Sequence, residues 1–367
     1  MFSNKYYDQK VLVTGHTGFK GSWLTTWLLK LGANVCGLSD RIPTTPSMFV
    51  ELGLEEKIEH HFCDIRDFEA VSKILTDFEP NYIFHLAAQP IVSAAYEDPL
   101  HTISTNVMGS AIFLEALRQW NQECNVVFIT SDKCYENVEW VWGYKETDHL
   151  GGKDIYSGSK GAAEVIFHCY YHSFFSKKDN KIRLATGRAG NVIGGGDWAK
   201  DRIVVDCMKK WAERAVVEIR SPNATRPWQH VLEPLSGYLT LGAKLSSTST
   251  LLGESFNFGP KSERNRTVLE LLVDLSGHWE FDSLEQAYRV ADNKPFYEAG
   301  LLKLNCDKSL FHLGWEANLS YEDCVEAVGE WYHSFYNLDI DMHQLTLKQI
   351  SQYESSGLKQ ELVWNRN

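Results

Sequence analysis

Several features that define protein classes are missing from this chain of 367 residues. No apolar stretch approaches the roughly 20 residues that a membrane span requires, and the N-terminal segment 1–7 lacks the apolar centre of a secretory signal. The eight cysteines include no CxxC pair, and none of the thirteen histidines has a spacing that demands a metal. We therefore expect a cytoplasmic protein with reduced thiols, no disulfide framework, no metal and no membrane partner.

An excess of basic residues is missing as well. The 36 lysines and arginines are outnumbered by 48 aspartates and glutamates, which argues against a nucleic acid as partner. An anionic small molecule can still be held by a few local arginines. Internal repeats and low-complexity tracts are also lacking, and the length suits one large or two moderate domains.

Short apolar runs alternate with helical patterns through the first half of the chain. The expected strands are 11–14, 34–39, 60–64, 82–86, 125–130, 182–186 and 256–259, and the expected helices include one after the first strand, 68–78, 106–120 and one carrying Tyr156. This alternation predicts an α/β fold, a doubly wound parallel sheet of the Rossmann type.

A change of composition marks the second part of the chain. Residues 190–234 are rich in Gly, Pro, Trp and Arg, which is typical of loops that build a substrate lid. We expect a nucleotide-binding domain over 1–188 with return segments near 231–259. A smaller C-terminal substrate-binding domain is expected over 189–230 and 260–340. The tail 341–367 has no motif and is either partly helical or frayed.

A glycine-rich turn directly follows the first strand. Gly15, Gly18 and Gly21 form a GxxGxxG pattern, which allows a tight turn and a close approach of the backbone to a pyrophosphate. Asp40 follows Gly21 by 19 residues, near the spacing of about 20 at which a carboxylate binds the adenosine ribose. Asp40 favours NAD over NADP, whereas the neighbouring Arg41 favours the opposite.

The expected cofactor contacts come from this turn and from the ends of later strands. Besides the three glycines and Asp40, they are Thr17, Phe19, Lys20, Asp64, Ile65, Leu86, Ala87, Ala88 and Gln89.

Tyr156 and Lys160 stand one helical turn apart. A free tyrosine has a pKa of about 10, and lowering it by three units requires about 4 kcal/mol of preferential phenolate stabilisation. An ammonium beside the ring together with the positive ring of a nicotinamide would supply it. On its own the pair is also typical of a solvated helix face. The glycine turn upstream makes nicotinamide redox chemistry the preferred interpretation.

Longer blocks of sequence resemble the extended short-chain dehydrogenase/reductase family, and within it the CDP-D-glucose 4,6-dehydratases of bacterial deoxysugar pathways. The matching blocks are GHTGFKGSW (15–23), HLAAQP (85–90), STNVMG (104–109), TSDKCY (130–135), the run 188–201 and TRPWQHVLEP (225–234). The likeness covers most of residues 8–335. The YxxxK and GxxGxxG patterns specify only the superfamily, whereas the SDKCYEN, GNVIGGGDW and RPWQHVLEPL blocks are specific to the subfamily.

The resemblance implies an internal redox cycle on CDP-glucose that consumes no net cofactor. Tyr156 would take the proton of the sugar O4 while NAD takes hydride from C4. Water would then leave across C5 and C6, and the hydride would return to C6. Asn106, Tyr156 and Lys160 are implied as further cofactor contacts.

The resemblance also assigns roles to the turn after the fifth strand. Ser131 would donate a hydrogen bond to O4, and Asp132 would protonate the leaving 6-hydroxyl, which requires a raised pKa. In related dTDP-glucose dehydratases a glutamate that abstracts the C5 proton occupies the next position, which is Lys133 here. Either Lys133 is that base, or it stabilises the enolate and another group takes the proton.

For the substrate, the resemblance implies that Arg226 clamps the nucleotide diphosphate, with Gln89, Asn191 and Arg202 as further contacts. The aromatic stretch 140–144 either walls the sugar pocket or packs in the core. A homodimer is implied, formed through the helices that contain Asn106 and Tyr156. The alternatives are an epimerase or a dehydratase of a different nucleotide sugar and, from another class, a non-catalytic dinucleotide-sensing scaffold.

Overall fold

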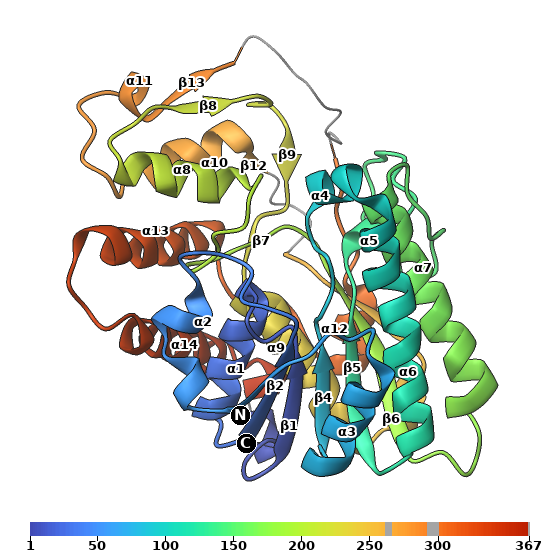
Figure 1. Ribbon diagram of the computed structural model, residues 1–367. Helices are drawn as coiled ribbons and strands as arrows, with labels where there is room; N and C mark the ends of the chain where they lie inside the picture. Colours follow the sequence, from blue (N-terminus) through green and yellow to red (C-terminus); the bar gives the residue numbers. More distant parts are fainter. Residues whose placement is uncertain (261–265, 292–300, 366–367) are drawn as a thin grey trace.

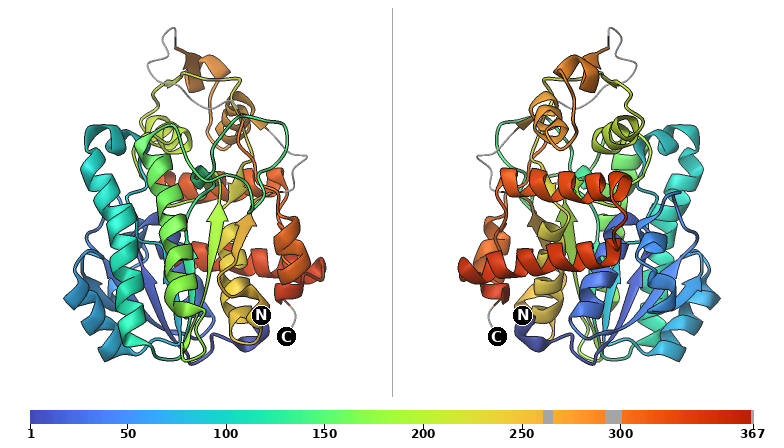
Figure 2. Two further views of the ribbon diagram at one scale, coloured as in Figure 1. Left: turned by 90° about the vertical axis from the view of Figure 1, so that its right-hand side faces the viewer. Right: turned by 90° about the vertical axis from the view of Figure 1, so that its left-hand side faces the viewer.

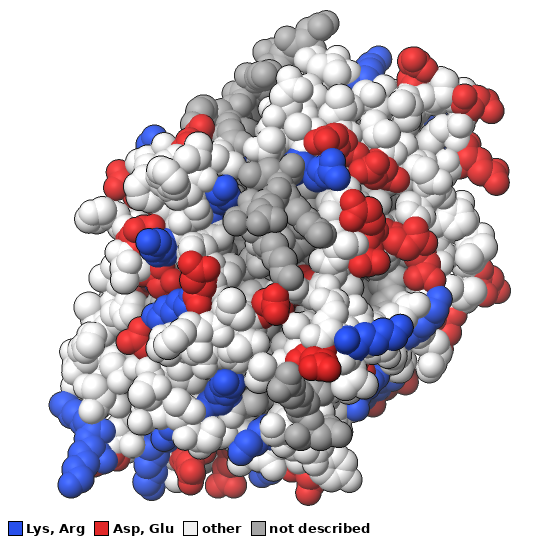
Figure 3. Space-filling model, turned by 180° about the vertical axis from the view of Figure 1, so that it is seen from behind, with Lys and Arg blue, Asp and Glu red and all other residues white. Residues whose placement is uncertain are grey.

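The computed structural model describes residues 1–260, 266–291 and 301–365. The expected domain limits also run through 261–265, 292–300 and 366–367, which lie outside the described residues. Within the described part, no helix is both long and apolar enough to cross a membrane. Acidic and basic side chains are interspersed on the face shown in Figure 3.

A seven-stranded parallel sheet forms the centre of the N-terminal part, in the order β11-β6-β5-β4-β1-β2-β3 (Figure 1). Its strands are β1 (Lys10–Thr14), β2 (Asn34–Ser39), β3 (Glu59–Phe62), β4 (Tyr82–His85), β5 (Cys124–Ile129), β6 (Ile182–Ala189) and β11 (Ser255–Phe258). Each of the seven expected strands is present within a few residues of its expected bounds. The doubly wound Rossmann-type fold is therefore confirmed.

Helices cover both faces of this sheet because successive side chains of each strand point to opposite sides. Leu12 packs in a core with α3 (Phe68–Phe78), α6 (Gly109–Trp120) and α7 (Ile155–Tyr170). Val11 and Val13 pack in the opposite core with α1 (Phe19–Lys30) and α9 (Leu232–Leu245). All three side chains are fully buried.

The helix expected over 106–120 begins earlier and contains a wide turn. Asp98 caps α5 (Pro99–Ile103) by accepting a hydrogen bond from His101 N, and the π-helical turn η3 (Ser104–Met108) joins α5 to α6. A π turn rotates the residues that follow it relative to a regular helix. Here it lies where Asn106 faces the interior.

Helices α8 (Ile203–Ala212) and α10 (Val268–Ser276) of the C-terminal part lie beyond the carboxyl ends of the strands (Figures 1 and 2). Its other long helices are α13 (Tyr321–Asn337) and α14 (Met342–Lys359), and α14 lies beside α1. Its short strands are β7 (Val192–Ile193), β8 (Val217–Ile219), β9 (Thr225–Arg226), β10 (Gln229–His230), β12 (Arg266–Thr267) and β13 (Tyr288–Val290). The short helices α11 (Leu284–Ala287) and α12 (Asp307–Leu313) also belong to the C-terminal part, whereas α2 (Met48–Glu51) and α4 (Val92–Glu97) belong to the N-terminal part.

One expectation for this part needs correction, and one open alternative is decided. The stretch 190–234 is not only loops, because α8 lies within it and buries Val204, Met208 and Trp211. For the tail, the partly helical alternative is correct, because α14 forms over Met342–Lys359. Helix α14 packs on α1, where Glu354 accepts a hydrogen bond of 2.8 Å from the Trp27 indole.

A buried ion pair attaches α7 to the sheet. Arg188 of β6 and Glu164 of α7 are 1% and 0% exposed, and they form two hydrogen bonds of 2.9 and 2.8 Å. Arg188 also donates to the Tyr135 hydroxyl at 2.7 Å and to Ser255 Oγ at 3.0 Å. Burial opposes the charge on Glu164, but Arg188 outweighs it and lowers the pKa of this carboxyl to about 2.

Replacing one partner of this pair should strongly destabilise the protein. We expect Arg188→Met to lower the free energy of unfolding by about 3–5 kcal/mol, because Glu164 would remain as a buried charge without its counter-ion. Urea denaturation measures the loss. The control is Arg118→Met, which removes an exposed pair with Glu115 and should cost no more than about 1 kcal/mol. Equal effects of the two substitutions would contradict the role given to Arg188.

Candidate active site

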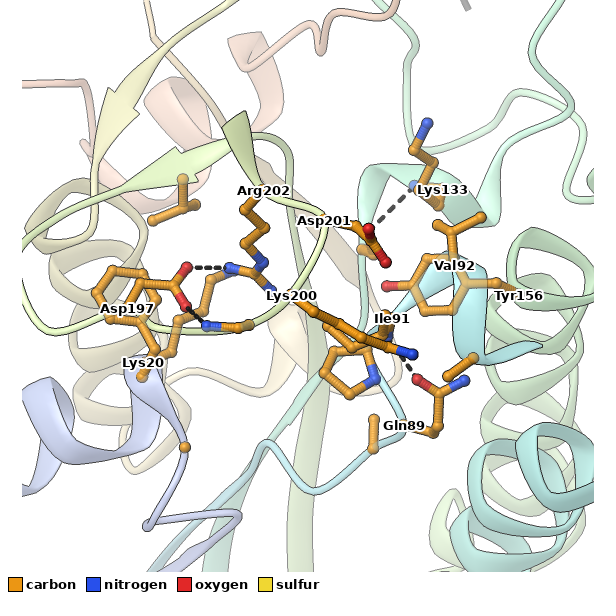
Figure 4. Close-up of a pocket in the computed structure, with 18 of the residues that line it drawn as sticks. Lys20, Gln89, Ile91, Val92, Lys133, Tyr156, Asp197, Lys200, Asp201 and Arg202 are labelled. Carbon is orange, nitrogen blue, oxygen red and sulfur yellow. Dashed lines mark hydrogen bonds and ion pairs between the residues drawn. The ribbon is translucent and has the colours of Figure 1, made fainter. Parts of the chain in front are cut away.

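A cleft of about 1510 Å³ separates the carboxyl ends of the parallel strands from the C-terminal part. Figure 4 shows its central region. All but one of the residues proposed from the sequence for cofactor, substrate or chemistry line this cleft. The exception is Asn106, which lies behind the wall.

The glycine turn packs against the end of β4. Gly15 has a φ of +73°, and a Cβ at this position would lie 2.9 Å from Ala87 N. A Cβ at Gly21 would lie 2.2 Å from Gly15 O, so neither position accepts a side chain. Gly18 precedes α1 and has no side chain to cap it, which leaves the helix N-terminus open to an anion in the cleft. This geometry fits a pyrophosphate.

The ends of β2 and β3 continue this half of the cleft. Asp40 is half-exposed, Arg41 Nε lies 3.5 Å from its carboxylate, and both residues line the cleft after β2. Asp64 accepts hydrogen bonds from Arg66, the shortest at 2.6 Å, and these hydrogen bonds lower the pKa of Asp64. Arg66 was not among the residues expected from the sequence. Its position two residues after the strand-end aspartate was the available signal.

Asn106 holds the wall of the cleft together and does not face the cleft. Its carbonyl oxygen accepts from Gln89 N at 2.8 Å, and its amide donates to Ser159 Oγ of α7 at 2.9 Å. Asn106 is therefore the one expected cofactor contact whose side chain does not line the cleft. The Gln89 amide is also engaged, because it donates to Thr102 Oγ1 at 2.7 Å and accepts from Ile91 N at 2.5 Å.

Tyr156 and Lys160 lie in the first turns of α7, which Asp154 caps by accepting a hydrogen bond from Ser157 N. Both side chains are buried, and Lys160 Nζ is 6.0 Å from the centre of the Tyr156 ring. Burial lowers the pKa of Lys160 to about 8. Burial and then Asp132 raise the pKa of Tyr156 to about 12, although Arg202 and Ser131 oppose this. Lys160 does not offset burial, so the expected lowering of the Tyr156 pKa does not come from the protein alone.

The turn after β5 places three polar residues beside Tyr156. Ser131 donates to Asp132 Oδ1 at 2.9 Å, and Asp132 is 4% exposed. Burial raises the pKa of Asp132, although the positive charges of Lys133 and Lys20 and the Ser131 hydrogen bond lower it. A carboxyl with a raised pKa suits an acid. The Lys133 side chain extends from this turn away from Tyr156 (Figure 4).

The loop before α8 brings a second group of charges into the cleft. Arg202 Nη1 lies 2.5 Å from Asp197 Oδ2, and this carboxylate is 6% exposed. The backbone of Asp197 is fixed by the Tyr332 hydroxyl, which accepts from its N–H at 3.0 Å and donates to its carbonyl at 2.5 Å. Asp197 and Tyr332 were not among the residues expected from the sequence. The signal for Asp197 was a lone carboxylate in the Gly- and Trp-rich run 190–198.

The expected substrate contacts lie on this side. Asn191 follows β6, and Arg226 lies on β9, where its guanidinium also donates to Thr225 O at 2.8 Å. The aromatic stretch does not line the cleft. Tyr144 is buried and donates to Asn137 Oδ1 at 3.0 Å, whereas Trp142 is 68% exposed. Of the two alternatives for the stretch 140–144, core packing is therefore correct, but only for Tyr144.

One group of possible metal ligands occurs in the described part of the chain, outside the cleft. It consists of Cys36, Glu59 and His61, and His61 Nε2 is 2.7 Å from Glu59 Oε1. Cys36 is fully buried, and burial raises the pKa of its thiol to about 12. The thiolate that a metal requires is therefore disfavoured. The expected absence of a metal stays a prediction.

Comparison with known proteins gives one clear family match. The profile of the GDP-mannose 4,6 dehydratase family matches residues 12–328. CDP-glucose 4,6-dehydratase of Salmonella typhimurium is 42% identical over 362 residues, which are 96% of this chain and 98% of the relative.

Solved structures agree in fold. An epimerase from Methanothermobacter thermautotrophicus has a TM-score of 0.77 with 21% identity, covering 95% of this chain and 96% of its own. The dTDP-glucose 4,6-dehydratase of Bacillus anthracis, solved in complex with NAD, has a TM-score of 0.74 with 17% identity, covering 89% and 97%.

The sheet, the glycine turn and the Tyr-Lys pair define an enzyme of the extended short-chain dehydrogenase/reductase class. Within that class, this chain belongs to the GDP-mannose 4,6-dehydratase family.

Proposed function

We propose that this protein is an NAD-dependent nucleotide-sugar 4,6-dehydratase that converts CDP-D-glucose to CDP-4-keto-6-deoxy-D-glucose. The observation that carries the proposal is the 42% identity to CDP-glucose 4,6-dehydratase along nearly the whole of both chains. The site supports the same chemistry, because a buried tyrosine, lysine and carboxyl meet in one cleft. The cytoplasmic location and the division into two domains stay predictions.

The cleft suits NAD on two physical grounds. The turn at Gly15 and Gly21 has no room for side chains, and the open N-terminus of α1 offers backbone amides to a pyrophosphate. Asp40 would bind the adenosine ribose, with Asp64 and the end of β4 beside it. When bound, NAD supplies the acceptor for the hydride of sugar C4 and returns it to C6.

The protein's own residues would move the protons. Tyr156 would take the proton of the sugar O4, with Lys160 beside the ring, and Ser131 would hold that oxygen by a hydrogen bond. Burial keeps the pKa of Tyr156 high in the protein alone. The positive nicotinamide ring of bound NAD would then stabilise the phenolate and lower this pKa.

The elimination would use the neighbouring carboxyl. Oxidation at C4 acidifies the C5 hydrogen, and Asp132 would protonate the 6-hydroxyl as it leaves. The base that takes the C5 proton is Lys133 or another group, and the direction of the Lys133 side chain favours neither role by itself. A buried acid beside Tyr156 favours a dehydratase over a 4-epimerase, because epimerisation needs no acid at the 6-hydroxyl.

The substrate is tested by incubating the purified protein with CDP-, dTDP-, GDP- and UDP-glucose. CDP-glucose should give the strongest alkali-induced 4-keto chromophore. A higher rate with another nucleotide sugar would replace CDP-glucose as the proposed substrate.

Tyr156→Phe should lower turnover by about 100-fold or more while NAD stays bound, because only the hydroxyl acts in proton transfer. Tyr7→Phe changes a tyrosine that is 62% exposed and should keep wild-type turnover. Nearly unchanged turnover of Tyr156→Phe would show that Tyr156 does not act in the chemistry.

Asp132→Asn should separate the two halves of the reaction. Because oxidation precedes loss of water, the variant should accumulate the absorbance band of reduced nicotinamide together with the 4-keto-glucose nucleotide. Asp77→Asn, an exposed aspartate on α3, should behave as wild type. If Asp132→Asn gives no reduced-nicotinamide absorbance, Asp132 is needed before elimination and is not its acid.

The homodimer implied by the family resemblance is part of this proposal. Apolar side chains are exposed along the outer faces of α5, η3 and α7, among them Leu100, Met108 and Val165 at 76%, 53% and 48%. A Cβ at Gly158, on the outer side of α7, would have nothing within 4 Å. Helices α6 and α7 lie side by side (Figure 1), so two copies would form a four-helix contact.

Light scattering at micromolar concentration tests this contact. The wild type should have the mass of a dimer, and Met108→Glu combined with Val165→Glu should give a monomer, because the contact would bury like charges. Leu358→Glu alters an apolar side chain of α14 that is 63% exposed and should leave the dimer intact. A monomeric wild type would rule out the dimer.

A further inference from the structure

Lys20 connects the two halves of the cleft. Its backbone lies in the first turn of α1, within the glycine pattern, and its side chain shares the wall of the cleft with Asp197 and Arg202 (Figure 4). A lysine in the first turn of a helix is electrostatically unfavourable, because the N-terminal end of the helix dipole is positive. Local helix stability therefore does not explain a lysine at this position.

The charges around Lys20 leave it without a carboxylate of its own. Asp197 is already engaged, with Oδ2 on Arg202 at 2.5 Å and Oδ1 accepting from Ala199 N at 3.0 Å. Asp132 accepts from Ser131. In the described part of the chain, no carboxylate lies within ion-pair distance of the Lys20 ammonium. Lys20 is partly buried, and a cation withdrawn from water is stabilised by a counter-ion, so an anionic ligand is the expected partner.

The pKa of Lys20 agrees with this arrangement. Burial, then Arg202 and Lys160, lower it to about 8, although the carboxylates of Asp132 and Asp197 oppose the shift. A dianion placed between Lys20 and Arg202 would relieve this repulsion and favour the charged ammonium.

Two dianions belong to the proposed reaction, the pyrophosphate of the cofactor and the diphosphate of the sugar nucleotide. The first has the backbone amides at the start of α1. The Lys20 side chain lies on the Asp197–Arg202 side of the cleft (Figure 4), where the substrate contacts are expected. We propose that Lys20 and Arg202 together bind the diphosphate of the nucleotide sugar, and that Asp197 is the positioning residue that holds Arg202 for this contact. This inference rests on the proposed function.

Asp197 can do this because it is fixed from two sides. Tyr332 of α13 holds its backbone, and the loop amide of Ala199 holds one carboxylate oxygen. The other oxygen then sets the direction of the Arg202 guanidinium, which keeps its remaining N–H donors for phosphate oxygens. Lys20 adds a point charge from α1.

Calorimetric titration of the NAD-saturated protein with CDP and with cytidine tests the proposal. Lys20→Met should weaken CDP binding at least about tenfold, because a charge-assisted contact to phosphate is lost. Cytidine lacks phosphate, so its affinity should not change. Lys20→Arg should restore most of the CDP affinity. Lys200→Met is the matched control, since this lysine also lines the cleft but pairs with Glu97 at 3.1 Å. It should change CDP affinity by less than about threefold.

The pH dependence provides a readout that a purely structural lysine would not change. Because the Lys20 pKa is about 8 before binding, CDP affinity should be full below that pH and should fall as the pH rises from 7 to 9. Lys160 titrates in the same range and faces the same cleft. Lys20→Arg distinguishes the two lysines. Because arginine stays charged between pH 7 and 9, this variant should lose the part of the pH dependence of CDP affinity that comes from Lys20.

Three results would overturn the proposal. They are unchanged CDP affinity in Lys20→Met, an equal loss in Lys200→Met, and a loss of NAD affinity with CDP binding intact, which would assign Lys20 to the cofactor. Titration with UDP, GDP and dTDP distinguishes a failure of the Lys20 proposal from a wrong choice of substrate nucleotide. If another nucleotide binds best, the choice of CDP-glucose fails, and the effect of Lys20→Met is then measured with that nucleotide.

Discussion

The buried ion pair between Glu164 and Arg188 is the interaction on which the arrangement of the active site depends. Arg188 comes from β6, Glu164 from α7, and the same guanidinium reaches Tyr135 after β5 and Ser255 of β11. On α7, Lys160 lies one turn and Tyr156 two turns before Glu164. An ion pair in a dry interior tolerates little displacement, because each partner would lose its counter-ion. The pair therefore fixes the position of Tyr156 and Lys160 relative to the ends of the strands.

Burial also determines the chemistry of the cleft. The chain carries a net charge of −12, yet Lys20, Lys160, Arg202 and Arg226 meet in one cleft. Removal from water brings the pKa of both lysines to about 8 and raises that of Asp132. Bulk charge argues against a polyanionic partner, whereas local charge suits small dianions. Proton transfer near neutral pH becomes accessible to groups that titrate far from it in water.

Much of the architecture follows from local patterns. Apolar runs such as 11–14 and 125–130 predicted their strands, and the 68–78 helix has the bounds its periodicity gave. Helix α8 was missed because Gly, Pro and Trp on either side of it made the whole stretch resemble loops. The tail was left open because α14 has a polar outer surface, and the face that makes it stable is defined only by its packing on α1.

By itself, the sequence determined the fold class, the glycine turn, the Tyr-Lys pair and the family resemblance, because each rests on residues close together in the chain or on long blocks of identity. Only the tertiary structure decided that Asn106 supports the cleft wall and does not line it, that Asp197 pairs with Arg202, and that Lys20 stands beside them. Lys20 and Arg202 are 182 positions apart, and Asp197 and Tyr332 are 135 apart. Contacts at such separations depend on how helices and loops pack, and the pKa of each group depends on the burial that results.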